Sequence, residues 1–166
     1  SDGFPALGEA RASASISYRI PDDVSELAGS HVVVVGAGHS ATHAVLRLSE
    51  LARRSPGTRV TWLLRRGSAM NVFGGGLGDE LPERAALGSR ARRMIDEGLV
   101  NLVTGFRVAE IRQEDEALTI IAEDGREVVG VVAHGVEHRL GDEAESPLRA
   151  DHQPAKDLHG GVGVEE

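Results

Sequence analysis

Residues 36–41, Gly-Ala-Gly-His-Ser-Ala, have the types and the spacing of a loop that holds a phosphate group. Gly36 permits a tight turn, and Gly38 lacks a Cβ, so that a ligand can approach the main chain. Ala41 is small enough for a helix to pack closely against a strand. The free N–H groups at the start of that helix, with the positive end of its dipole, favour a pyrophosphate. We therefore expect a dinucleotide-binding loop made of Gly36, Ala37, Gly38, His39, Ser40 and Ala41.

Two arginines indicate which dinucleotide this loop would bind. Arg65 and Arg66 directly follow an apolar segment at 59–64, and no acidic residue occurs until Asp79. An NAD site usually has Asp or Glu at this place, because a carboxylate accepts hydrogen bonds from the ribose 2′-hydroxyl. A guanidinium group instead suits the 2′-phosphate of NADP(H). The sequence therefore predicts NADP(H) as the ligand, although the same two arginines would also be ordinary surface charge after a strand.

The elements that must position these residues form a βαβ pattern. The apolar run 31–36 is typical of a strand buried on both faces. A second strand is predicted at 59–64. Between them, one stripe of a helix is marked by Ala41, Ala44, Val45, Leu48, Leu51 and Ala52. The sequence Ser-Pro-Gly at 55–57 ends this helix. The whole pattern occupies roughly the 30 residues of a βαβ unit.

The pattern changes after residue 104. A helix is predicted at 83–97 and a third strand at 100–104. Short alternating segments follow at 106–112, 117–123 and 127–133, and they are typical of an antiparallel meander whose hairpin turn is Asp124-Gly125. The expected fold class is therefore α/β, with a Rossmann-like parallel sheet, helices and a small antiparallel β-meander.

The same reading divides the chain into three parts. Residues 1–29 are expected to be a connector with a short strand at 16–20. Residues 30–138 would form the NADP(H)-binding domain. Residues 139–166 are polar, show no periodicity and are predicted to be a disordered tail.

Composition limits the classes of function. The chain of 166 residues suits one domain, and the absence of cysteine excludes a disulfide framework or a dithiol redox centre. No apolar run approaches the roughly 18 residues of a membrane span, and no signal-like stretch is seen, so we expect no membrane partner and a cytoplasmic location. Ten arginines and four acidic residues lie between Arg47 and Arg93 in a chain of net charge −8. Such a basic island favours a small anionic ligand over nucleic acid.

Three stretches of the chain resemble a known family. These are GAGHSA at 36–41, VTWLLRRG at 60–67 and the long segment at 78–111. They resemble the NADPH-binding half of the FAD-dependent pyridine nucleotide-disulfide oxidoreductase superfamily, close to flavin-containing monooxygenases and thioredoxin reductase-like enzymes. The resemblance covers roughly residues 15–135, about three quarters of the chain. It implies a central parallel sheet and a three-stranded meander, inserted into an FAD domain.

The resemblance also assigns site residues. The glycine motif of the family falls on Gly36, Gly38 and Ala41, and its helix-start pattern falls on residues 39–41. Its paired arginines for the 2′-phosphate fall on Arg65 and Arg66. The Ala-Thr-Gly turn of the family, near the return to the FAD domain, falls on residues 133–135, where His134 replaces the threonine.

The function implied is an NADP(H)-binding domain of a flavin-dependent oxidoreductase, monooxygenase-like or thioredoxin reductase-like, which delivers hydride from NADPH to a flavin held elsewhere. The missing cysteine pair favours the monooxygenase-like branch. FAD is implied by the family, but residues 1–30 contain no second glycine motif. We therefore expect a truncated domain that is inactive by itself. Its partners would be NADPH and the FAD-binding portion of a parent enzyme.

Two other functions stay open at this point. One is a non-enzymatic module that senses NADP(H) and reports it to a partner. The other is an α/β-hydrolase with Ser40 as the nucleophile, because GHSAT at 38–42 nearly matches G-x-S-x-G, although Thr42 stands where glycine is required. Trp62 is interpreted as a core residue. The glycines at 74–78 suit either a flap near the coenzyme or a plain surface loop.

Overall fold

The computed structural model describes residues 6–21, 23–69, 73, 82–115, 117–130 and 132–134. Two short 3₁₀ helices lie near the N-terminus, η1 (Ser13–Ser15) and η2 (Ser25–Leu27). The two α-helices are α1 (His39–Arg54) and α2 (Pro82–Asp96). The strands are β1 (Ile16–Ser17), β2 (His31–Val35), β3 (Arg59–Leu63), β4 (Asn101–Val103), β5 (Val108–Glu114), β6 (Ala117–Ala122), β7 (Glu127–Gly130) and β8 (Val132–His134).

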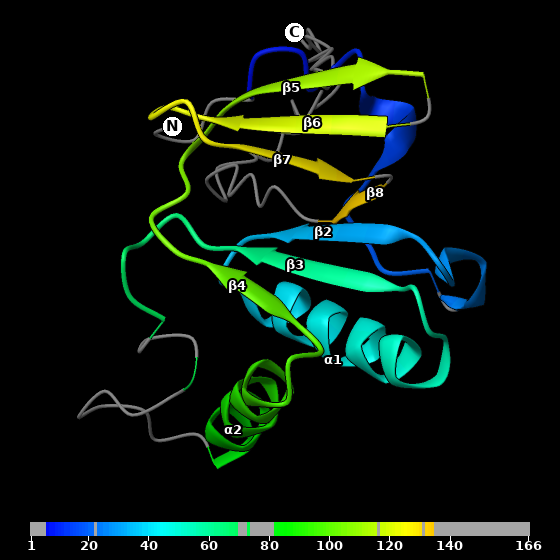
Figure 1. Cartoon of the computed structure of the whole chain (residues 1–166). Helices are drawn as coiled ribbons and strands as arrows, with labels where there is room; N and C mark the ends of the chain where they lie inside the picture. The colour runs from blue at the N-terminus through cyan, green and yellow to red at the C-terminus, as the bar shows by residue number, and fades with distance from the viewer. Residues whose placement is uncertain are drawn as a thin grey trace, which may run out of the picture.

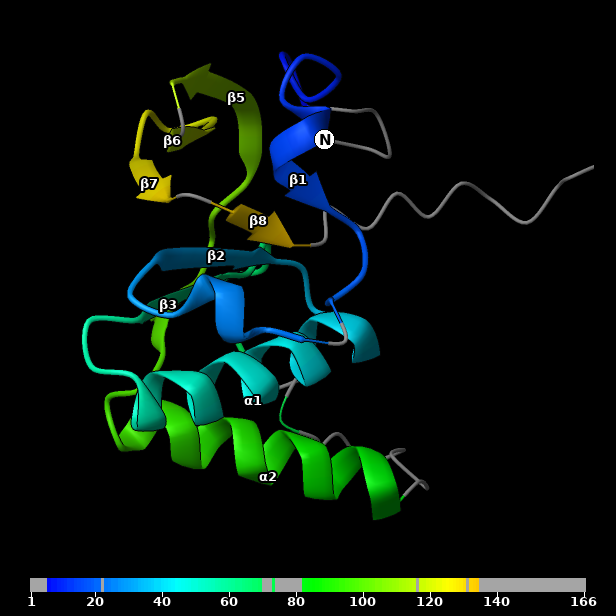
Figure 2. The ribbon, with the colours of Figure 1, turned by 90° about the vertical axis from the view of Figure 1, so that its right-hand side faces the viewer.

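The elements form three layers. The middle layer is a five-stranded sheet in the order β1-β8-β2-β3-β4, with every neighbouring pair parallel. Helices α1 and α2 cover one face, and the antiparallel sheet β5-β6-β7 lies on the other side, as Figures 1 and 2 show. The expected fold class, a Rossmann-like parallel sheet with helices and an antiparallel meander, is confirmed.

The central strands are buried on both faces, as their continuous apolar runs predicted. Alternate side chains point to opposite faces of a strand, so β2 and β3 supply two separate cores. Under the helices lie Val32, Val34, Val60, Trp62 and Leu64, whereas Val33, Val35 and Leu63 lie under the meander. The parallel sheet is therefore the shared wall of both cores, which fixes the ends of β2 and β3 where the predicted site begins.

Helix α1 follows the predicted apolar stripe. Ala41, Ala44, Val45, Leu48 and Leu51 are buried. The helix ends where the Ser55 N–H donates to the Leu51 carbonyl at 2.8 Å, just before Pro56 and Gly57. Arg53 and Arg54 occupy the last turn, where the helix dipole favours positive charge. No helix in the described ranges is both long enough and apolar enough to cross a lipid bilayer.

One predicted strand belongs to two sheets. The expected meander segment 127–133 is divided after Gly130: β7 completes the meander, and β8 enters the parallel sheet between β1 and β2. At Gly130 the meander passes so close to β2 that an added Cβ would lie 2.6 Å from Val33 Cγ2 and 2.8 Å from the His31 carbonyl oxygen. The prediction of a single strand is therefore wrong, because a residue without a side chain is needed at the crossing.

The N-terminal segment contributes more than a bare connector would. Ala6, Ala12 and Ile16 are buried in the core under the meander. β1 pairs with β8 at Ile16 and Ser17, so only two residues of the predicted strand 16–20 are extended. The divisions proposed at residues 29 and 138 stay predictions, and the predicted tail 139–166 lies outside the described residues.

Candidate functional site: a glycine turn and two arginines at one edge of the sheet

The glycine turn directly follows β2. Gly36 has φ +118°, in a region that favours glycine. Its N–H donates to the Leu63 carbonyl at 3.0 Å, and its own carbonyl accepts a 2.8 Å hydrogen bond from Trp62 Nε1. Both partners belong to β3. The turn is therefore held on two sides by the neighbouring strand, and the sequence had indicated a tight turn at this residue.

The first turn of α1 offers unused hydrogen-bond donors. Gly38 is the N-cap, with φ −79° and ψ 172°, and no side chain caps the helix. The Gly38 carbonyl accepts from the Thr42 N–H at 3.1 Å and from Thr42 Oγ1 at 3.2 Å. The N–H groups of residues 39–41 have no acceptor among the described residues, as is usual at a helix start. Together with the dipole, these donors can bind an anion.

The side chains of this loop divide into packing and exposed groups. Ala41 is 2% exposed and packs in the core under the helices, as its small size predicted. Ala37, His39 and Ser40 are exposed. His39 Nε2 lies 2.9 Å from His43 Nε2, one helical turn further along α1. The hydrolase alternative gains no support, because Ser40 makes no hydrogen bond to any histidine or carboxylate in the described part of the chain.

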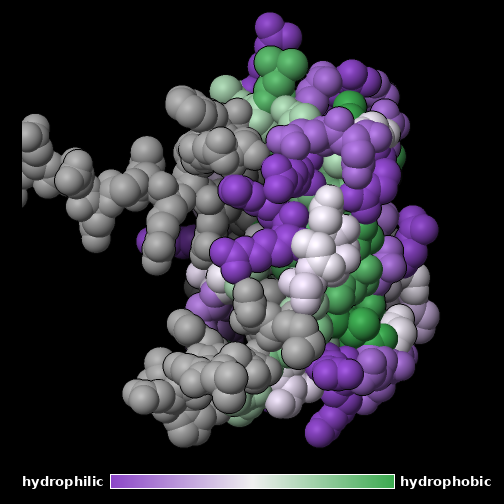
Figure 3. Space-filling view, turned by 90° about the vertical axis from the view of Figure 1, so that its left-hand side faces the viewer, coloured by the Kyte–Doolittle hydropathy of each residue, from purple (hydrophilic) through white to green (hydrophobic). Residues whose placement is uncertain are grey.

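The two arginines lie at the same edge of the sheet as the glycine turn. Val35 pairs with Leu63 in the parallel register, so Gly36 and the segment 64–66 leave the sheet side by side. Arg65 and Arg66 are both exposed. Figure 3 looks at the side of the molecule where β2 and β3 end in Figure 1, and hydrophilic side chains gather there beside a pale band. The arrangement can place two guanidinium groups near the main-chain N–H groups at the start of α1.

Hydrogen bonds with the end of β4 and with the loop after it fix the main chain at Leu64 and Arg66. The Leu64 N–H donates to the Val103 carbonyl at 2.8 Å. The Gly105 N–H, from a residue with φ +66°, donates to the Arg66 carbonyl at 2.9 Å. The arginine segment is therefore a fixed strand end, from which only the side chains need to move toward a ligand.

The sequence did not reveal the role of Arg126, and it revealed only part of the role of Trp62. Arg126, in the hairpin between β6 and β7, donates to the carbonyls of Thr104 at 3.3 Å and Gly105 at 2.6 Å. No local pattern could have found it, because its partners lie more than twenty positions away. Trp62 is a core residue, as interpreted, but its indole N–H also holds the glycine turn. A buried polar group that needs a partner was the available signal.

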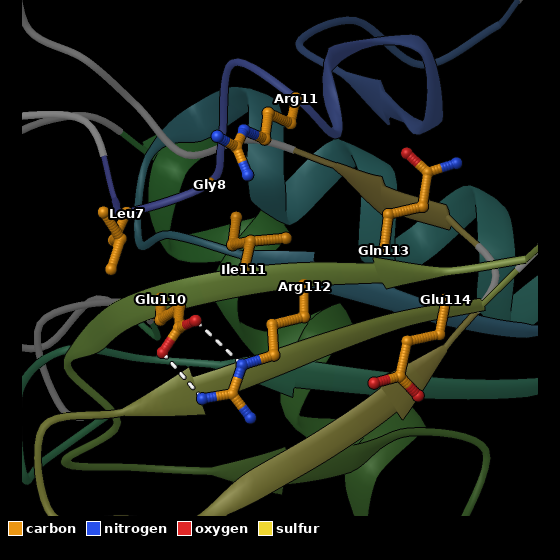
Figure 4. Close-up of a pocket in the computed structure, with 8 residues that line it drawn as sticks. All are labelled: Leu7, Gly8, Arg11, Glu110, Ile111, Arg112, Gln113 and Glu114. Atoms are coloured by element: carbon orange, nitrogen blue, oxygen red, sulfur yellow. Dashed lines mark hydrogen bonds and ion pairs between the residues drawn. The ribbon is translucent and has the colours of Figure 1, made fainter.

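A separate hollow of about 490 Å³ lies away from this edge. Its lining comes from the N-terminal residues Leu7, Gly8 and Arg11 and from residues 110–114 of β5 (Figure 4). Arg112 donates to both carboxylate oxygens of Glu110, at 2.8 and 3.0 Å. This bonding lowers the pKa of Glu110 and raises that of Arg112. Because none of the predicted site residues lines it, the hollow is no candidate for the coenzyme.

Several predicted residues are placed only in part. In the backbone, β8 sets Ala133 beside Ile16 and Val33, and His134 beside Ser17 and Val34. The segment expected to resemble the Ala-Thr-Gly turn thus ends at the same edge as the glycine turn. Gly135 and the glycines at 74–78 lie outside the described residues.

No protein-family model matches the chain, and a search of curated proteins finds no match. Solved structures do match. A pyridine nucleotide-disulfide family oxidoreductase from Enterococcus faecalis aligns with TM-score 0.53 and 13% identity, over 79% of this chain and 27% of its own. The bacillithiol disulfide reductase of Staphylococcus aureus aligns with TM-score 0.56 and 14% identity, over 79% and 35%. The thioredoxin reductase of Giardia duodenalis aligns with TM-score 0.54 and 19% identity, over 81% and 40%.

These matches show that the chain shares the fold of one part of such oxidoreductases. It spans well under half the length of each of the three proteins. The resemblance stated from the sequence is therefore supported at the level of the fold. The particular coenzyme, the roles of single residues and the activity stay predictions.

Proposed function

We propose that the chain is the NADP(H)-binding domain of a flavin-dependent oxidoreductase. The observation that supports this most strongly is the meeting of two anion-binding features at one sheet edge. The N–H groups at the start of α1 lack acceptors among the described residues, and Arg65 and Arg66 follow the neighbouring strand. A dinucleotide with an additional phosphate has anionic groups for both features.

The glycine turn would hold the pyrophosphate. Gly36 shapes the turn, Ala37 and Gly38 present main chain without bulky side chains, and His39, Ser40 and Ala41 supply N–H groups at the positive end of the helix dipole. The small, buried Ala41 keeps the helix close to the sheet. These contacts recognise a diphosphate but do not distinguish NADPH from NADH.

The arginines would supply that distinction. A guanidinium group donates charge-assisted hydrogen bonds to a 2′-phosphate, each worth roughly 1.5–3 kcal/mol. In NADH the adenosine ribose has a 2′-hydroxyl in place of the 2′-phosphate, so neither Arg65 nor Arg66 would find an anionic partner there. The fixed main chain at Leu64 and Arg66 keeps both side chains at the strand end.

Hydride transfer would require a flavin held by another part of a parent enzyme. The FAD implied by the sequence resemblance, the fold match to disulfide and thioredoxin reductases, and the short span of the chain relative to them support this placement. When bound, NADPH supplies the hydride, and the chain's own residues bind and orient it. The absence of cysteine favours a monooxygenase-like parent, whereas the matching structures include a bacillithiol disulfide reductase and a thioredoxin reductase.

A calorimetric titration tests the proposal. We expect the wild-type chain to bind NADPH more tightly than NADH. Arg65→Ala and Arg66→Ala should each weaken NADPH binding by about ten-fold or more and leave NADH binding unchanged. Arg59→Ala is the matched control, because it removes an exposed guanidinium from the opposite end of β3. Equal losses for both coenzymes, or no NADPH binding by the wild type, would contradict the proposal.

A sensing module would bind NADPH in the same way. Enzymatic and sensing roles are separated by mixing the NADPH-loaded chain with the FAD-containing remainder of its parent protein and following flavin reduction. Loss of flavin absorbance supports the oxidoreductase assignment, whereas unchanged absorbance favours the sensing role.

A further inference from the structure

Trp62 stands directly behind the glycine turn. It is the only tryptophan of the chain, its side chain is fully buried, and its Nε1–H donates to the Gly36 carbonyl at 2.8 Å. In a planar trans peptide, the C=O and the following N–H point in opposite directions. A Gly36 carbonyl that faces the buried indole therefore turns the Ala37 N–H away from the core.

The neighbouring donor is already in use. The Gly36 N–H is bonded to the Leu63 carbonyl at 3.0 Å, so it is not available to a ligand. The Ala37 N–H has no acceptor among the described residues. It is thus the first donor after β2 that a pyrophosphate can use, and its direction depends on the peptide plane that Trp62 holds.

Packing keeps the indole in place. The ring of Phe73 meets Trp62 edge to face, with centroids 6.3 Å apart and planes at 76°. The Phe73 main chain lies against α2 at Gly88, where an added Cβ would be 2.2 Å from the Phe73 carbonyl oxygen. The Phe73 N–H also donates to the Ala69 carbonyl at 3.2 Å. Phe73 is therefore packed against the same indole that holds the glycine turn.

We propose that Trp62 is a positioning residue of the coenzyme site, which aims the Ala37 N–H at the pyrophosphate through its hydrogen bond to Gly36. The inference rests on the proposed function, and it adds a residue that neither the glycine motif nor the paired arginines include. Phe73 acts one step further back, because it holds the indole and not the peptide.

The test removes the Nε1–H of Trp62 and keeps an aromatic side chain at position 62. Trp62→Phe removes the N–H with a moderate loss of volume, and incorporation of benzothienylalanine at position 62 removes it with almost no change of shape. Each protein is titrated calorimetrically with NADPH and with adenosine 2′-monophosphate, which lacks a pyrophosphate. We expect NADPH affinity to fall by about five-fold in both variants, the size of one neutral hydrogen bond. Affinity for adenosine 2′-monophosphate should stay unchanged.

A core control separates positioning from general destabilisation. Ile120→Val removes a methyl group from a fully buried residue in the other core, under the meander. It should leave both affinities unchanged. Unaltered NADPH binding in the benzothienylalanine protein, or equal weakening of both ligands, overturns the inference while the proposed function stands. Wild-type protein that binds no NADPH overturns both.

Discussion

The guanidinium of Arg126 donates a 2.6 Å hydrogen bond to the carbonyl of Gly105. The N–H of Gly105 in turn donates to the carbonyl of Arg66 at 2.9 Å. Arg126 also lies over the ring of Phe106, 5.4 Å from its centroid, and its Nε and Nη2 lie 2.9 and 2.8 Å from Oδ2 of Asp124. Arg126 of the meander thereby fixes the loop at Gly105, which in turn is hydrogen-bonded to the main chain of Arg66.

Arg126→Gln should therefore weaken NADPH binding, by less than Arg66→Ala does, and leave NADH binding unchanged. The loop at 104–105 loses its side-chain donors, and the Arg66 main chain is held less firmly. Parallel titrations with both coenzymes measure the effect. Arg107→Gln is the control, since its contact to Glu123, at 4.0 Å, lies between two exposed side chains. If Arg126→Gln binds NADPH as the wild type does, the loop is held adequately without this residue.

Gly36→Ala should lower the free energy of unfolding by about 1–3 kcal/mol, because a side chain is strained at φ +118°. Urea denaturation of the chain measures the loss. Gly67→Ala serves for comparison, because that glycine has no left-handed φ and no described residue lies within 4 Å of its Cβ position. Similar stabilities for the two variants would show that the Gly36 turn adapts without strain.

Gly130→Ala should destabilise the fold by roughly 1–3 kcal/mol, the usual cost of overpacking. The new methyl group would meet Val33 Cγ2 at 2.6 Å and the His31 carbonyl oxygen at 2.8 Å, and main-chain atoms yield less than side-chain ends. Val129→Ala is the matched control, because Val129 is the neighbouring residue and is 52% exposed. Thermal denaturation of both variants decides the point, and a Gly130→Ala protein as stable as the control would refute close contact between β7 and β2.

The single tyrosine should titrate late. Tyr18 donates a 2.6 Å hydrogen bond to Glu9, and that bond, partial burial and the carboxylate charge raise the pKa of Tyr18 to about 12 from 10.0. Because the raised pKa belongs to the folded state, this contribution to stability is complete below pH 10 and is lost as the pH rises toward about 12. Tyrosinate absorbance follows the titration directly.

Glu9→Gln should lower the pKa of Tyr18, since the amide oxygen still accepts a hydrogen bond but has no negative charge. Tyr18→Phe should abolish the stability change in the same alkaline range. A midpoint for wild-type Tyr18 at the value of free tyrosine would mean that the pair with Glu9 does not persist in solution.

The elements around the glycine turn could be predicted because their signals are local. The valines of β2 form one continuous apolar run, and the buried face of α1 repeats with helical spacing. β7 and β8 could not be separated in the same way. A short apolar run looks alike in either sheet, and only the close approach of Gly130 to Val33 explains why the strand is divided there.

In the candidate site, too, some features could be predicted from the sequence and others could not. The positions of Gly36, Ala41, Arg65 and Arg66 at one edge follow from the βαβ pattern and its register. The hydrogen bonds from Trp62 to Gly36 and from Arg126 to Gly105 join residues 26 and 21 positions apart. Each depends on how two strands or two loops come to lie together, which residue type alone does not disclose.

The insertion of β8 between β1 and β2 has a consequence for biosynthesis. Within the described residues β1 pairs only with β8, so β1 can join the sheet only after β8 has been synthesised. Long-range closures of this kind are entropically costly and slow. During synthesis there is therefore a stage in which β2, α1 and β3 can assemble while β2 still exposes an unpaired backbone edge, and such an edge can pair with a strand of another chain.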